Sequence, residues 1–143
     1  MKSSTLNANL IKKYHQDIVF NYAEYPTKDH WNFDFNSENY KKALTEWLQK
    51  NPNTPIFFYV HIPFCEQLCW FCTCSKFITK DYERVKEYLI YLYKEIDILF
   101  NLLNENNIKL NVRTVFFGGG SPTILNKADL KKLVDKLKGL FDW

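Results

Sequence analysis

Hydrophobic and polar positions form two kinds of pattern along the chain, one typical of helices and one typical of buried strands. The first segment with helical periodicity spans residues 37–50. Its apolar positions are Tyr40, Ala43, Leu44, Trp47 and Leu48. Ser37 is a good N-cap for this segment. We therefore predict a helix that ends near Lys50, before the Asn- and Pro-rich residues 51–55.

Two short runs have the composition of strands. Residues 56–62 form a nearly continuous run of β-prone side chains, and residues 112–117 form a second run. A continuous apolar run of this length is typical of a strand in a parallel sheet that is covered on both faces. We therefore expect both strands to be buried on both faces.

A helix is predicted after each strand. The first spans about Asp81 to Asn104, and its apolar stripe consists of Val85, Leu89, Leu92, Ile96, Leu99 and Leu103. The second follows Asn126, a potential N-cap, and ends at Gly139. Its inward positions are expected to be Leu130, Leu133, Val134 and Leu137.

Strands that alternate with helices predict an α/β fold with parallel pairing. Sites in such folds lie at the carboxyl ends of the strands, so segments 65–74 and 118–120 are expected at one edge of the sheet. Two strands are too few for a stable sheet. We therefore expect the first part of a larger protein, or a truncated product, with an N-terminal extension over 1–54 and the start of a core over 55–143.

Composition narrows the class of protein. The chain has 143 residues, of which 46% are hydrophobic and 24% charged, as in a globular domain. A net charge of +3, scattered along the sequence, argues against nucleic acid or an anionic membrane as a partner. No apolar run approaches the roughly 20 residues of a membrane helix. No secretory core follows Met1, so a cytoplasmic protein is expected.

Cysteine and glycine are concentrated in two places. All four cysteines lie within 65–74, and three of the four glycines are residues 118–120. Disulfides would be strained at such short spacings, and zinc sites usually take two separated ligand pairs. Buried structural cysteines rarely crowd together in this way. An iron–sulfur cluster is favoured, either held by three thiolates with one iron open or closed by all four.

The amino-acid sequence around these two clusters resembles that of a known family. The three segments that carry the resemblance are Tyr59 to Cys65, Leu68 to Lys76, and Phe117 to Thr123. They resemble the radical S-adenosylmethionine (SAM) superfamily and, within it, the oxygen-independent coproporphyrinogen III oxidase family. Tyr22 to Thr27 also resembles the tyrosine–proline element of that family, although Asn21 stands where an Arg is expected.

The resemblance implies a fold and a set of ligands. The fold would be the N-terminal portion of an incomplete (β/α)6 barrel, with about two β–α units present. The ligands of a [4Fe–4S] cluster would be Cys65, Cys69 and Cys72. The SAM contacts would be Tyr59 and Gly119 for a first molecule, and Phe71, Gly120 and Ser121 for a second. Cys74 would not be a cluster ligand.

The resemblance also implies a reaction. The full-length enzymes oxidatively decarboxylate coproporphyrinogen III to protoporphyrinogen IX in haem biosynthesis, with an electron donor such as flavodoxin or ferredoxin. This chain would be the cluster-binding part, inactive alone and with exposed hydrophobic surface. The alternatives are a haem chaperone, a haem-degrading relative, and a small iron–sulfur electron-transfer module.

Each residue also has a purely structural interpretation. The glycine run could form an ordinary tight turn. Tyr59 and Phe71 could be core aromatic residues. His61 is expected to be a hydrogen-bonded core histidine, and Trp70 and Phe64 are expected to shield the cluster.

Overall fold

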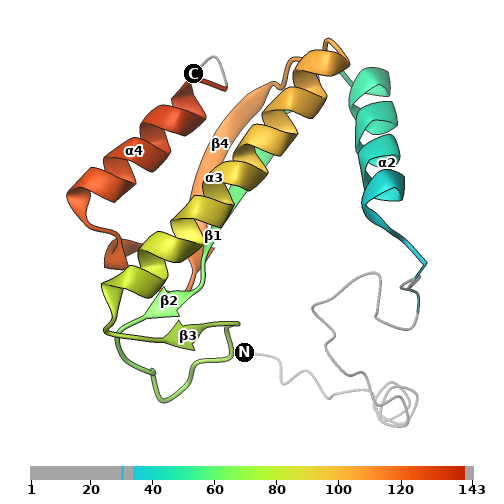
Figure 1. The fold of residues 1–143 in the computed structure, drawn as a ribbon. Coiled ribbons are helices and arrows are strands. Elements are labelled where there is room, and N and C mark those ends of the chain that lie inside the picture. Colours follow the sequence, from blue (N-terminus) through green and yellow to red (C-terminus); the bar gives the residue numbers. More distant parts are fainter. Residues whose placement is uncertain (1–29, 31–33, 141–143) are drawn as a thin grey trace, which may run out of the picture. The chain divides into compact units, whose positions relative to one another are not determined.

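The structure is a computed structural model, and it describes residue 30 and residues 34–140. The chain divides into two units between Asn36 and Ser37, and the second unit is described here. The tyrosine–proline element at 22–27 lies outside the described residues. The elements of the second unit (Figure 1) are α2 (Ser37–Lys50), β1 (Ile56–Ile62), β2 (Phe64–Cys65), β3 (Phe77–Ile78), α3 (Tyr82–Glu105), β4 (Val112–Gly119), η2 (Pro122–Ile124) and α4 (Lys127–Lys138).

The main sheet consists of β1 and β4, which pair in parallel. The register runs from Ile56 opposite Val112 to Ile62 opposite Gly119. The predicted α/β class and parallel pairing are therefore confirmed. Strand β4 is longer than predicted, because the first two glycines of the run continue the ladder.

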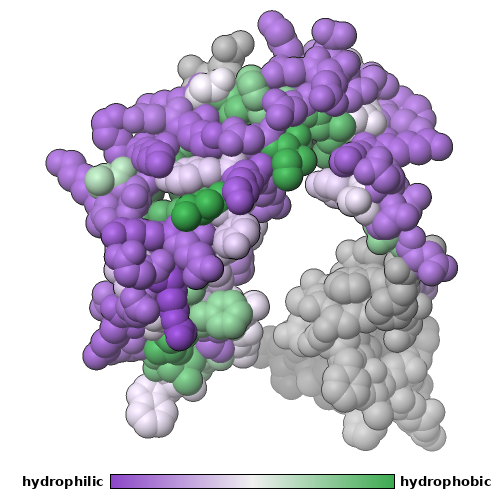
Figure 2. Space-filling model, viewed as in Figure 1, coloured by the Kyte–Doolittle hydropathy of each residue, from purple (hydrophilic) through white to green (hydrophobic). Residues whose placement is uncertain are grey.

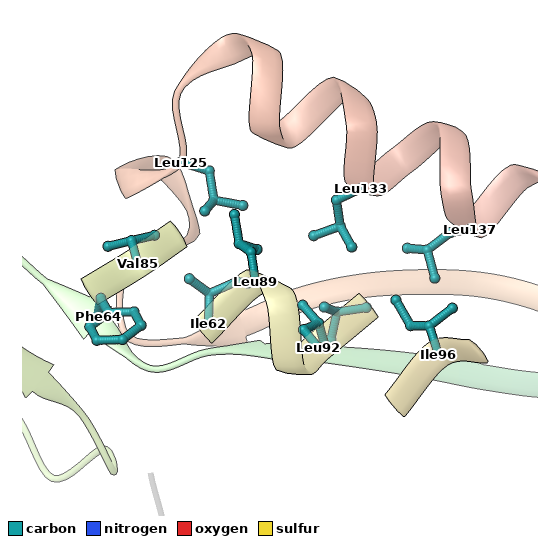
Figure 3. Packing of buried hydrophobic residues seen from close by; sticks show 10 residues of the cluster. Ile62, Phe64, Val85, Leu89, Leu92, Ile96, Leu125, Leu133 and Leu137 are labelled. Carbon is teal, nitrogen blue, oxygen red and sulfur yellow. The ribbon is translucent and has the colours of Figure 1, made fainter. Parts of the chain in front are cut away.

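Helices α3 and α4 cover one face of this sheet (Figure 1). Figure 3 shows Leu125, Leu133 and Leu137 pointing toward the side chains of α3. The most deeply buried side chains of this core come from three elements, and they are Ile62, Val85, Leu133 and Leu137. Burial of apolar area of this kind is the main favourable contribution to folding.

The other face of the sheet is open, so the expectation that both strands are buried on both faces is wrong. Phe57 is 75% exposed, Tyr59 53% and Phe116 61%. Side chains of a strand alternate between its faces, and both covering helices pack on the same face. The aromatic residues of the opposite face are therefore exposed to solvent. This agrees with the expectation that the chain has exposed hydrophobic surface.

The helices begin and end close to the predicted residues. Asp81 accepts a hydrogen bond from the backbone N–H of Glu83, and Asn126 accepts one from that of Asp129 at 2.8 Å. Gly139 ends α4 with a φ of −70°, an ordinary right-handed conformation. Leu130, expected inward, is 37% exposed, because it lies at the border of the buried stripe.

Among the α-helices in residues 34–140, α2 is the least buried, and Leu48 is its one buried residue. Its aromatic residues Tyr40 and Trp47 are 57% and 46% exposed. None of the helices in 34–140 combines the length and apolar character needed to span a bilayer.

The packing of the core in Figure 3 predicts different effects on stability for two leucines of α4. Leu133→Ala removes a side chain with 0% exposure and leaves a cavity, so we expect a loss of about 2–5 kcal/mol in the free energy of unfolding. Leu130→Ala, on the exposed border of the same helix, should cost well under half of that. Denaturant unfolding of both variants measures the difference. Equal losses would contradict this description of the core.

Candidate metal centre

The cysteine segment is a loop whose two ends are joined. β2 and β3 pair in parallel, with Phe64 opposite Phe77. The backbone N–H of Phe77 donates to the carbonyl of Pro63 at 2.6 Å, and that of Thr79 donates to the carbonyl of Cys65 at 2.9 Å. Cys65 therefore lies in a short strand. The rest of the cysteine segment protrudes from this clamp.

The turn after β4 lies directly against the start of this loop. The N–H of Gly120 donates to the carbonyl of Ile62, and the N–H of Ser121 donates to that of Phe64, both at 2.8 Å. The hydroxyl of Ser121 donates to Sγ of Cys65 at 3.6 Å. The predicted meeting of the two clusters at one edge of the sheet is therefore confirmed.

Two glycines of this turn allow the close approach. Gly119 has a φ of +106°, and a Cβ there would lie 2.7 Å from the His61 ring. A Cβ at Gly120 would lie 2.5 Å from the carbonyl oxygen of Phe64 and 2.9 Å from Sγ of Cys65. These contacts need the absence of a side chain, which gives both glycines a structural reason.

The three predicted ligands share the loop but are not gathered at one point. All four cysteines are free thiols; Cys65 and Cys72 are half-buried, while Cys69 and Cys74 are exposed. Within the described part of the chain, no three His, Cys, Asp or Glu side chains converge closely enough to hold a metal ion. The backbone N–H of Cys72 donates to the carbonyl of Cys69 at 3.1 Å, which makes a turn between these two residues.

The donor set fits an iron–sulfur cluster. Closely spaced thiolates on one loop are the ligands that such clusters take. The backbone N–H of Cys74, with the ammonium of Lys76, holds the pKa of the Cys72 thiol below its usual value, and the thiolate is the ligating form. Binding would have to draw Cys69 and Cys72 toward Cys65, because metal binding and local folding are coupled.

A hollow of about 350 Å³ lies between the cysteine loop and the turn after β4. Its lining residues are Glu66, Gln67, Cys69, Ser121, Thr123 and Ile124. Its volume is at the small end of the range for ligand pockets. Of these residues, sequence reasoning singled out Cys69 and Ser121. The other four lining residues were not predicted from the sequence, because their residue types are common in loops. The one sequence signal that could identify them is their position next to the two motifs.

Tyr59 lies on the open face of the sheet. Its hydroxyl is 3.0 Å from Nδ1 of His61, and its ring stacks on Phe116 with centroids 6.0 Å apart. Tyr59 is therefore not a core aromatic residue. His61 is hydrogen-bonded, as expected, but it is half-buried on the open face and is not a core residue. Its carbonyl accepts a bond from the hydroxyl of Tyr88 at 2.6 Å. Burial raises the pKa of Tyr88, which keeps this phenol protonated as a donor.

The aromatic residues of the loop differ in their surroundings. Phe64 is buried and packs edge-on against Tyr88, with centroids 5.6 Å apart. Phe71 is 87% exposed and Trp70 is fully exposed, and the shielding role expected for Trp70 stays a prediction. Hydrophobic side chains reach the surface at the end of the molecule where β2 and β3 lie (Figure 2). The exposed ones there include Leu68, Phe77 and Ile78.

Comparison with known proteins decides the family. No protein-family model matches the chain. The oxygen-independent coproporphyrinogen III oxidase of Mannheimia haemolytica is 35% identical over 133 residues, which are 93% of this chain and 85% of that protein. This chain belongs to the oxygen-independent coproporphyrinogen III oxidase family. The Escherichia coli protein of the same name is 34% identical over 134 residues.

A solved structure agrees with this membership. The coproporphyrinogen III oxidase of Escherichia coli, described as a radical SAM enzyme, matches with a TM-score of 0.72 at 33% identity. The match covers 96% of this chain and 28% of that protein. The chain likewise spans only 27% of the Escherichia coli and Salmonella typhimurium relatives. The family assignment therefore concerns one part of the longer enzymes.

The close contact at Gly120 makes a prediction. Gly120→Ala would force the new Cβ against the Phe64 carbonyl, so we expect a loss of about 1–3 kcal/mol in the free energy of unfolding. Gly139→Ala is the matched control, since its Cβ would meet nothing closer than 3.4 Å. Denaturant unfolding compares the two. Equal stability of both variants would show that the turn does not need its glycine.

Proposed function

We propose that this chain provides the cluster-binding part of a radical SAM oxidase that converts coproporphyrinogen III to protoporphyrinogen IX. One observation carries the proposal: the Gly120–Ser121 turn lies against Cys65, where two parallel strands end. This arrangement joins the two motifs that resemble the family. The 35% identity to a named oxidase supports the same function.

In this proposal, Cys65, Cys69 and Cys72 ligate a [4Fe–4S] cluster and leave one iron open to SAM. Such a cluster supplies the electron that cleaves the sulfonium bond of SAM. The chain fixes Cys65 from two sides, by Thr79 and by Ser121. Cys69 and Cys72 then complete the ligand set from the protruding part of the loop.

The contacts with SAM follow from the same residues. Tyr59 and Gly119, proposed for a first molecule, share a neighbour, because the His61 ring bonds Tyr59 and packs on Gly119. Gly120 and Ser121 are proposed for a second molecule. Phe71 would join them only after the loop closes, since its ring is 87% exposed here.

The remaining parts of the proposal concern the longer enzymes. Coproporphyrinogen III would be the substrate, flavodoxin or ferredoxin the electron donor, and a six-stranded (β/α)6 barrel the complete core. A cytoplasmic location stays a prediction. We expect the 143-residue chain to be inactive alone, because Phe57, Tyr59 and Phe116 line a sheet face open to water. Radical chemistry needs a site that excludes water.

Electron paramagnetic resonance tests the proposed function. The chain, reconstituted with iron and sulfide without oxygen and reduced with dithionite, should show a [4Fe–4S] signal that changes when SAM is added. An iron left open by three thiolates explains this response. A closed four-thiolate cluster or a zinc site would show no such change, and either result would overturn the proposal. Coproporphyrinogen III added to the same sample should remain unconverted.

The ligand set makes a separate prediction. Cys65→Ser, Cys69→Ser and Cys72→Ser should each lose most of the bound iron and sulfide, because serine is a poor ligand for such clusters. Cys74→Ser is the matched control and should keep both. Iron and sulfide analysis after anaerobic reconstitution measures the four variants. Loss of the cluster in Cys74→Ser would identify Cys74 as a fourth ligand instead.

A further inference from the structure

Both the main chain and the thiol of Cys65 accept hydrogen bonds from other segments of the fold. Its carbonyl accepts the N–H of Thr79 at 2.9 Å, and Thr79 is buried, with 8% exposure. Its Sγ accepts the hydroxyl of Ser121 at 3.6 Å. The absent side chain of Gly120 leaves room for that sulfur. The main chain and the thiol of Cys65 are thus both positioned by contacts within the protein.

Ser121 is itself fixed by its backbone. Its N–H donates to the carbonyl of Phe64 at 2.8 Å, and its carbonyl accepts the N–H of Ile124 at 2.9 Å. Ser121 precedes the short helix η2 as its N-cap, yet its side chain makes no capping bond. Serine at this position usually caps with its hydroxyl. Here the hydroxyl is directed to the sulfur of Cys65.

We propose that Ser121 is a positioning residue for the cluster, whose hydroxyl donates a hydrogen bond to the Cys65 thiolate. This proposal rests on the proposed function, because it presupposes a cluster on Cys65. It gives Ser121 a role that does not depend on a second SAM. Hydrogen bonds to ligating sulfur set the potential of iron–sulfur clusters and help to retain them. The bond stabilises the more electron-rich reduced cluster, so it raises the midpoint potential.

The test is a redox titration of the reconstituted 143-residue chain, followed by electron paramagnetic resonance without SAM. Ser121→Ala should shift the midpoint potential to more negative values. It should also release iron to a chelator roughly 10-fold faster, the lower end of the usual effect of losing an outer-shell partner. Ser121→Thr keeps a hydroxyl and should restore both values. Thr123→Ala, which removes a hydroxyl that lines the same hollow, should match the unchanged chain.

The outcomes separate this inference from the proposed function. If the unchanged chain binds no cluster, both fail. If it binds a cluster that responds to SAM but Ser121→Ala keeps the potential and the iron-release rate, this inference alone fails. Ser121→Gly removes the same hydroxyl and must shift the potential in the same direction. Circular dichroism of each variant checks that the fold is retained. An effect of Thr123→Ala as large as that of Ser121→Ala would also overturn the inference.

Discussion

Parallel pairing of β1 with β4 is the constraint on which the candidate site depends. The register that places Ile62 opposite Gly119 also brings Gly120 and Ser121 onto the residues that lead to Cys65. A slip of one residue would exchange the two faces of a strand and move the turn away from the sulfur. Two segments more than 40 residues apart in sequence therefore meet because of one ladder of backbone hydrogen bonds.

The same ladder separates the roles of the two faces of the sheet. One face holds the apolar core under α3 and α4, and burial of apolar area is the dominant favourable contribution to folding. The other face carries Tyr59, His61 and Phe116, which interact with one another through a hydrogen bond and a stacked pair. Residues that contact a ligand must be reachable, so they belong on the face that the helices leave open. Tyr59, a proposed SAM contact, lies on this open face, at the cost of exposed aromatic area.

The sequence predicts the parts of this structure that leave a periodic signal. The stripe from Val85 to Leu103 identifies α3, and Asp81 and Asn126 mark helix starts because their side chains accept backbone N–H groups. A continuous apolar strand does not show which face is covered, so the open face was not predicted. The β2–β3 clamp consists of two-residue strands, which are too short to show a periodic pattern of hydrophobic residues. The bond from Ser121 to Cys65 depends on tertiary pairing, and for Ser121 the family resemblance implied only a SAM contact.

The different surroundings of Cys65, Cys69 and Cys72 have a physical reason. Three thiolates brought together without a metal would repel one another, and ordering the whole loop would cost conformational entropy. The chain therefore pre-positions one thiol, Cys65, through the fold itself. Cys69 is exposed and Cys72 half-buried. The N–H of Cys72 donates to the carbonyl of Cys69, and the carbonyl of Cys72 accepts a bond from the ammonium of Lys76. A cluster that binds first at Cys65 would then be enclosed by the other two, with its attraction for thiolates offsetting the ordering of the loop.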